Sequence, residues 1–132
     1  MLWVEAFMVL GVSHAVGDFV LQTEWQATRK HGGLGPDPEA RRALLSHVFT
    51  YGLAMLPGFI WLGTEIGWPV VLIAVFILGT HLIQDDGRLL FAYMRRVKKA
   101  DPLKYPQLAI LVDQSVHVTI LFFAALMASG VG

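Results

Sequence analysis

Hydrophobic residues fill four long stretches of the chain, and polar connections separate them. The apolar stretches cover residues 2–21, 43–62, 68–85 and 108–127. An apolar helix needs about 20 residues, at a rise of about 1.5 Å each, to cross a hydrocarbon core of about 30 Å. The pattern therefore predicts an all-α, polytopic membrane protein in which residues 1–132 form one integral-membrane domain, a four-helix bundle.

The connections between the predicted spans differ in charge. All ten Lys and Arg residues lie in the first and third connections, whereas the short second connection, residues 63–67, has none. Positive charge marks cytoplasmic connections, so we expect both termini to face the outer side. Residues 88–99 place apolar side chains on one helical face and basic ones elsewhere, which predicts a basic amphipathic extension of the third span along the inner leaflet.

Local signals describe the first connection. Asp37 followed by Pro38 predicts the start of the second helix, because these residues favour the first positions of a helix. Residues 32–36 are rich in glycine and end in proline, which indicates a flexible turn. We expect His31, beside this turn, to lie in solvent.

The composition favours a membrane protein and excludes several chemistries. Hydrophobic residues make up 55% of the chain, charged residues 15%, and the mean hydropathy is +0.58, whereas about a quarter of the residues in soluble domains are charged. A soluble four-helix bundle, the alternative, would carry Lys and Arg along the outer face of every helix. The absence of cysteine excludes disulfides, thiolate metal ligands and thiol nucleophiles. A net charge of zero gives no indication of nucleic-acid binding.

Ionisable residues lie within the spans or at their inner ends, where they are costly. A central Asp costs about 2.5 to 3.5 kcal/mol on insertion scales, so these side chains must face inward and be paired or coordinated. Three His/Asp pairs are four residues apart, which puts both members on one helix face. The pairs are His14 with Asp18, His81 with Asp85, and Asp113 with His117. The second span offers His47, with Tyr51 one turn further.

The four histidines in the spans also lie at matching depths. Counted from the inner ends of their spans they lie 5 to 10 residues in, which is about 8 to 15 Å below the inner surface. The spacing His-x-x-x-Asp at residues 14–18 recurs at residues 81–85, so the chain contains an internal repeat. We therefore expect two pseudo-repeated hairpins related by an axis along the membrane normal. Asp113 breaks the symmetry, because Ala43 takes its place in the other half.

This convergence of imidazole and carboxylate groups predicts a metal site. The predicted ligands are His14, Asp18, His47, His81, Asp85, Asp113 and His117. Nitrogen and oxygen donors suit zinc, with manganese or iron as alternatives. Seven groups are too many for one tetrahedral ion, so we expect two divalent ions bridged by a carboxylate. Such a pair clamps the attacking and leaving oxygens of a phosphoester and supplies a water nucleophile.

Other polar residues are expected around the ligands. Gln22, Gln84, Gln114 and Tyr51 are candidate hydrogen-bond partners of the ligands. Lys30, Arg41 and Arg88 are candidates for binding an anionic lipid or phosphorylated substrate. Asp86 is left out of the cluster, because we expect it to point away.

These motifs together resemble a known family. They are His14-x-x-x-Asp18-Phe19-x-x-Gln22-x-x-Trp25 with Lys30 beyond, Leu45-x-His47, His81-x-x-x-Asp85, and Asp113-Gln114-x-x-His117. The combination resembles a family of small bacterial inner-membrane proteins, the domain of unknown function 3307. Where that family commonly has Lys, this chain has Arg88. The resemblance implies a multi-pass protein of the bacterial inner membrane that is similar to membrane-bound metal-dependent hydrolases.

Three functions are compatible with the sequence. The leading hypothesis is a metal-dependent hydrolase of a phosphoester or lipid at the cytoplasmic side. A divalent-metal or proton transporter or channel is the first alternative, and it needs a water path that reaches both faces. A non-catalytic membrane subunit with a structural metal site is the second. The lipid bilayer is the expected partner, and the sequence leaves a homo-oligomer open.

Overall fold

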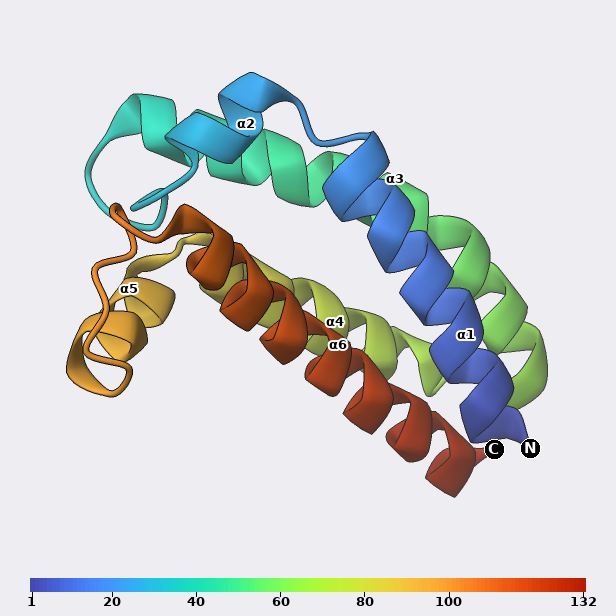
Figure 1. The fold of residues 1–132 in the computed structure, drawn as a ribbon. Helices are drawn as coiled ribbons and strands as arrows, with labels where there is room; N and C mark the ends of the chain where they lie inside the picture. The colour runs from blue at the N-terminus through green and yellow to red at the C-terminus, as the bar shows by residue number, and fades with distance from the viewer.

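The regular elements of the protein are all helices. The computed structural model describes residues 1–132. The elements are α1 (Leu2–Ala15), a π-helical turn (Val16–Val20), α2 (Glu24–Arg29), α3 (Pro38–Ile66), α4 (Val70–Asp85), α5 (Arg88–Arg96) and α6 (Pro106–Val131). The prediction of an all-α fold is therefore confirmed. In Figure 1, α1 packs against α3 and α6, and α4 packs against the same two helices.

Three helical segments are long and apolar enough to cross a membrane. They are α1 continued by the π turn (Leu2–Val20, 19 residues), α3 (29 residues) and α6 (26 residues). A fourth span requires α4 and α5 to count as one, since α4 alone has 16 residues and α5 follows at an angle of 61°. The first three segments overlap the predicted spans 2–21, 43–62 and 108–127, and α4 overlaps the predicted span 68–85 but is short of a full span by itself. The side of the membrane on which each end lies stays a prediction.

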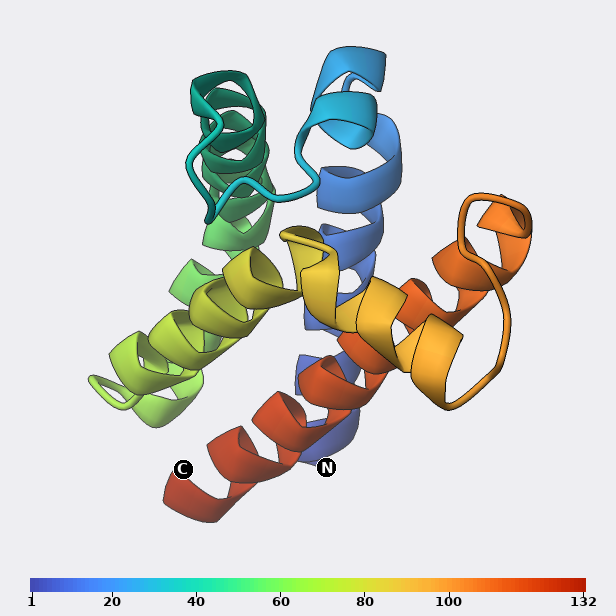
Figure 2. The same cartoon turned by 90° about the vertical axis from the view of Figure 1, so that its left-hand side faces the viewer.

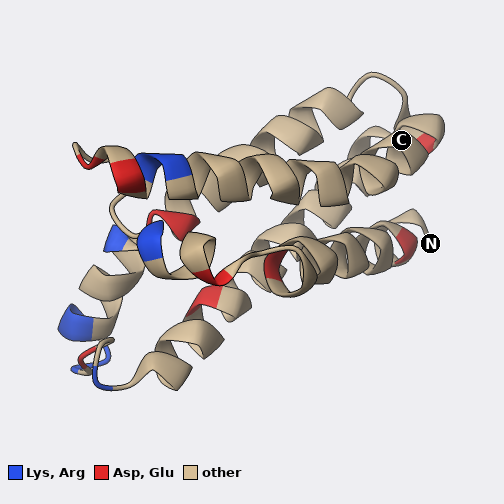
Figure 3. Cartoon of the chain, turned by 90° about the horizontal axis from the view of Figure 1, so that it is seen from above, with Lys and Arg blue, Asp and Glu red and all other residues tan.

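Charge separates the two ends of the molecule. Lys and Arg gather at the end that carries α2 and α5, which we call the basic end, and both chain termini lie at the opposite end (Figure 3). Asp37 and Pro38 begin α3 as predicted, because the Asp37 side chain accepts a hydrogen bond from the backbone N–H of Glu39 at 2.9 Å. The distribution of charge matches the separation read from the sequence.

Helix α2 was not foreseen. It begins with a capping box in which the Thr23 hydroxyl accepts from the Gln26 backbone N–H at 3.2 Å, and the Gln26 side chain accepts from the Thr23 N–H at 3.0 Å. Gln26 also donates to Ser46 of α3 at 3.2 Å, which ties α2 to that helix. The chain therefore turns back after the first span and brings Lys30 over the bundle.

The third span ends in a sharp break. Gly87 has a φ of +78°, a left-handed conformation that favours glycine, and α5 leaves α4 at 61° (Figure 2). The expected continuous extension of the span is thus a separate short helix. Its amphipathic pattern is retained, because Leu89 and Tyr93 are exposed beside basic residues while Met94 is fully buried.

Apolar side chains fill the bundle between the histidines and the termini. The core cluster consists of Ala6, Leu10, Tyr51, Met55, Phe59, Leu62, Ile66, Ile73, Ile77, Leu121, Ala124, Ala125 and Ala128. In each of α1, α3, α4 and α6, these core residues lie between the histidine of that helix and the end of the molecule that carries the chain termini. The polar cluster therefore lies between a dry core on one side and the basic end on the other.

Candidate metal centre

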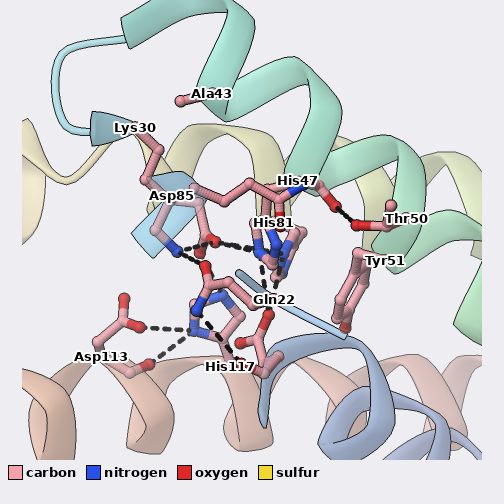
Figure 4. Close-up of polar contacts among 12 residues, drawn as sticks. Gln22, Lys30, Ala43, His47, Thr50, Tyr51, His81, Asp85, Asp113 and His117 are labelled. Carbon is pink, nitrogen blue, oxygen red and sulfur yellow. Dashed lines mark hydrogen bonds and ion pairs between the residues drawn. The ribbon is translucent and has the colours of Figure 1, made fainter. Parts of the chain in front are cut away.

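Five ionisable side chains converge where the π turn, α3, α4 and α6 meet. Asp18, His47, His81, Asp85 and His117 have at most 5% of their surface exposed. His47 Nε2 lies 3.1 Å from Asp18 Oδ1 and 2.8 Å from Asp85 Oδ2. His117 Nε2 lies 2.9 Å from Asp85 Oδ1, and His81 Nε2 lies 3.4 Å from an oxygen of each aspartate (Figure 4). The predicted meeting of the four helices at one polar layer holds for these five residues.

The converging atoms fit a metal ion. Asp18, His81, Asp85 and His117 each offer one ligand atom, and these four atoms lie within 4.8 Å of one another. Ligands about 2.1 Å from an ion at tetrahedral angles lie about 3.4 Å apart, close to the 2.9 to 3.4 Å between the imidazole nitrogens and carboxylate oxygens. Three of the atoms involved are buried without a hydrogen-bond partner: Asp18 Oδ1, Asp85 Oδ1 and His117 Nε2. A cation among them would satisfy all three.

The orientation of His117 supports this fit. Its Nδ1 donates a hydrogen bond to the backbone carbonyl of Asp113 at 2.8 Å. In the neutral ring, that bond leaves the lone pair of Nε2 facing Asp85 Oδ1 at 2.9 Å. A proton on Nε2 or a metal ion between the two atoms would remove the repulsion of their lone pairs. A carbonyl bond at the far nitrogen is the usual orienting contact of a metal-binding histidine.

Two of the predicted ligands lie beside the converging atoms. Gln114 Oε1 accepts from His14 Nε2 at 2.8 Å, and His14 Nδ1 accepts from the Tyr51 hydroxyl at 2.9 Å. Gln114 also donates to Asp18 Oδ2 at 3.0 Å. The Asp113 carboxylate lies 3.6 Å from His117 Nδ1 and is partly exposed. In this arrangement His14 and Asp113 orient the inner residues, and their coordination of a second ion stays a prediction.

Tyr51 packs against the side of the cluster that faces the apolar core. Its ring stacks on His81 with centroids 3.5 Å apart and planes 8° from parallel. The π turn approaches this ring closely, because a Cβ atom added at Gly17 would lie 2.6 Å from Tyr51 Cδ2. Glycine is therefore required where the turn crosses α3. Tyr51 thus contacts two histidines, one through its ring and one through its hydroxyl.

Lys30 reaches the cluster from the end of α2. Its Nζ donates to Asp85 Oδ2 and to Gln22 Oε1, both at 2.6 Å (Figure 4). Gln22 donates in turn to the backbone carbonyl of Asp18 at 3.2 Å. Gln84 also faces the site, and its Oε1 is buried without a partner. Of the three predicted substrate-binding cations, Lys30 is the one at the cluster.

The other two predicted cations hold the first connection in place instead. Arg41 donates to the backbone carbonyl of Gly35 at 2.9 Å, and Arg88 donates to Asp86 Oδ2 at 2.7 Å. Asp86 points away from the cluster, as predicted, and accepts from the backbone N–H of Leu34 at 2.8 Å. Burial alone would raise the pKa of Asp86, but the bonds from Arg88 and Leu34 outweigh it and lower that pKa. These bonds place Arg41 and Arg88 at the first connection and the break after α4, and their binding of an anionic substrate stays a prediction.

The connection is accordingly more ordered than its glycines suggest. The N–H of Gly32 donates to the carbonyl of Asp86 at 2.8 Å, and the His31 ring lies against the Phe91 ring with centroids 4.3 Å apart. Burial lowers the pKa of His31, against the opposite effect of Asp86. His31 is exposed to solvent, as predicted, while the Asp86-Gly87 break supplies the connection with backbone and side-chain partners that hydropathy does not reveal.

The two sequence halves contribute unequally. Asp18 and Asp85, the matched aspartates of the internal repeat, both contact His47 and His81. Ala43, which the repeat aligns with Asp113, presents only a methyl group and is fully buried (Figure 4). The half that contains Asp113 therefore carries the additional carboxylate.

Comparison with known proteins gives a family. The model of a family described as protein of unknown function (DUF3307) matches residues 6–131, which include all the residues of the candidate site. No curated protein and no solved structure matches the chain. The geometry of the site is therefore the source of functional information.

Proposed function

Because the chain belongs to the DUF3307 family of proteins of unknown function, we propose a function from the geometry of its polar cluster. The protein is a membrane-embedded metalloprotein, and its bound metal hydrolyses a phosphoester at the cytoplasmic side of the bacterial inner membrane. The observation that carries the proposal is the convergence of Asp18, His81, Asp85 and His117 on one point, with buried ligand atoms that lack hydrogen-bond partners.

The donor set supports a hydrolytic metal. Two imidazole nitrogens and two carboxylate oxygens suit zinc first, and manganese or iron next. A divalent ion held there would polarise a phosphoryl oxygen and make water nucleophilic at neutral pH. His47, whose Nε2 lies 3.1 Å from Asp18 Oδ1 and 2.8 Å from Asp85 Oδ2, would hold both carboxylates in place beside the ion. A second ion with Asp113 among its ligands would complete the two-metal arrangement.

Access from one end favours hydrolysis over transport. A cavity of about 630 Å³ at the basic end reaches Asp18, Asp85 and Asp113. On the other side of the cluster, the apolar core fills the space between the helices. An enzyme needs access from one side only, whereas a transporter needs a path on both. Reconstituted protein should therefore show no uptake of zinc or protons into liposomes.

The metal content of purified protein tests the proposal. Elemental analysis should find at least one zinc, manganese or iron per chain, and the ratio would distinguish one ion from two. Asp85→Asn keeps the shape of the side chain and removes the charge that faces His47 and His117, so it should lose the metal. His81→Ala should do the same, because it removes a ligand atom. Asp113→Ala should lose only a second ion.

Asp86→Asn is the matched control for the metal experiment. It changes the neighbouring carboxylate, which bonds Leu34 and Arg88 outside the cluster, and should retain the metal. Circular dichroism of each variant shows whether the helices persist. A wild-type protein that binds no stoichiometric metal after supplementation, or equal metal loss in the Asp85 and Asp86 variants, would refute the metal site.

A further inference from the structure

The cavity at the basic end has two kinds of wall. Its inner wall is polar and contains the three carboxylates of the site together with Gln22, Gln84, Gln114 and Lys30. The rest of its wall is mostly apolar: it includes Phe19, Leu90, Phe91, Leu103, Ala109 and Ile110, together with the polar Thr28 and His31. The volume, about 630 Å³, is that of a small-molecule site. A bound molecule with a charged group at one end and hydrocarbon at the other would match both walls.

Exposed apolar residues of the cavity lie on segments that are candidates to span the membrane. Phe19 on the π turn is 61% exposed, and Ile110 on α6 is 56% exposed. Ile110 lies four residues into α6, about 6 Å along the helix axis, and a long apolar segment follows it. Phe19 and Ile110 both line the cavity, and they lie on two segments that are long and apolar enough to span a membrane. Deeper in the cavity, Gln114 of α6 donates to Asp18 of the π turn, so the two segments are joined there.

The neighbouring helix α5 suits a membrane surface. Leu89 and Val97 are 66% and 64% exposed, and Arg95 and Arg96 stand beside them on the helix. An amphipathic helix with a basic face lies in the plane of the membrane surface and attracts anionic lipids. Leu90 and Phe91 of the same helix line the cavity. The element that borders the cavity is thus suited to lie among lipid headgroups.

We propose that this cavity binds a membrane lipid with a terminal phosphate, which enters sideways between the π turn and α6. The proposal rests on the proposed function, since the metal and Lys30 would together bind the phosphate. The acyl chains stay in the bilayer beside Phe19 and Ile110. Hydrolysis then consumes one water: its oxygen bonds to phosphorus, the ester P–O bond breaks, and the leaving alcohol takes up a proton. The products are inorganic phosphate and a neutral lipid alcohol.

Charge and access both favour a lipid over a soluble phosphoester. Lys30 is the one lysine or arginine that lines the cavity; its side chain is 16% exposed, and its ammonium group donates to Asp85 and Gln22. A soluble phosphoester would gain nothing from the exposed apolar residues of the cavity, whereas a lipid is already in the membrane.

Two neighbouring residues of α6 give a matched test. Ile110 lines the cavity, whereas Leu111 is 66% exposed and lies outside it. Ile110→Asn should weaken the binding of dioleoyl phosphatidate in nanodiscs at least fivefold, and Leu111→Asn should leave it unchanged. Ala109→Phe, which fills the cavity, should also weaken binding, with the exposed Ala15→Phe on α1 as its control. Titrations with glycerol 3-phosphate, which has no acyl chains, should show binding at least tenfold weaker than that of phosphatidate.

Metal analysis of the same samples separates this inference from the proposed function. Normal metal content with selective loss of phosphatidate binding in the Ile110 and Ala109 variants supports the lipid site. Equal binding of glycerol 3-phosphate and phosphatidate, or equal weakening by the Ile110 and Leu111 variants, overturns it while leaving the metal site intact. Absence of metal with retained, Ile110-dependent phosphatidate binding would overturn the hydrolase and support the lipid site.

Discussion

Substituting Tyr51 with Phe removes one hydroxyl from the centre of the bundle and changes little else. The ring can stay stacked on His81 at 3.5 Å, and the tyrosine is 1% exposed, so no solvent replaces the hydroxyl. What is lost is the hydrogen bond from the hydroxyl to His14 Nδ1 at 2.9 Å. The His14 ring is 3% exposed, and its other nitrogen is already bonded to Gln114. The variant therefore leaves one buried nitrogen without a partner.

The expected loss of stability follows from this one unpaired nitrogen. Hydrogen bonds between membrane helices average about 0.6 kcal/mol and reach about 1.7. A buried acceptor left unpaired costs about 1 to 3 kcal/mol in proteins generally. His14 cannot turn to water at this depth, so the upper part of the membrane range applies, and we expect a loss of about 1 to 2 kcal/mol. This corresponds to a decrease of about five- to thirtyfold in the ratio of folded to unfolded protein.

Reversible unfolding in mixed micelles measures this change. Tyr93→Phe is the control, because Tyr93 lies on α5 and is 46% exposed. Tyr51→Phe should lower the free energy of unfolding while keeping most of the metal, since the tyrosine contacts the ligand His81 only through its ring. Equal stability of the two variants would refute the reasoning about the unpaired nitrogen. Complete metal loss in Tyr51→Phe would show instead that His14 is a ligand held by this bond.

Two further predictions concern glycine and the first connection. Gly17→Ala places a methyl group 2.6 Å from Tyr51 Cδ2, so it should lower the free energy of unfolding in mixed micelles by about 1 to 3 kcal/mol. Gly11→Ala is the control and should not lower that free energy, because no atom lies within 4 Å of its added Cβ. Asp86→Ala removes the carboxylate that bonds the connection at residues 31–35, so limited proteolysis there should be about tenfold faster, whereas the exposed Glu65→Ala should leave the rate at that of the wild type.

The sequence predicted the centre of the site because its determinants are periodic. Spacing of four residues fixes which side chains share a helix face, and hydropathy fixes how deep they lie. Together these rules bring Asp18, His47 and Asp85 to the same layer, and the structure joins them within 3.1 Å. No packing detail is needed for this result, since antiparallel helices of similar length align matching depths. The same rules gave the all-α fold and the start of α3.

The sequence did not predict features that depend on contacts between distant segments. Helix α2 depends on a capping box whose spacing from Thr23 to Gln26 was present but not recognised. The roles of Arg41 and Arg88 depend on the path of the first connection, which depends on the break at Gly87. The partners of His14, Tyr51 and Gln114, come from two other helices. Periodicity places such a residue on the right face but does not choose its partner.

The insertion of Lys30 beside Asp85 sets the charge balance of the site. With imidazoles counted as neutral, the three aspartates and this lysine leave two negative charges. One divalent ion would bring the site to electrical neutrality, so that it could hold a neutral ligand without an excess of charge. Two divalent ions would leave two positive charges, which the phosphate group of a lipid at neutral pH would cancel. The number of bound ions therefore determines which charge a substrate must carry for the occupied site to be neutral inside the membrane.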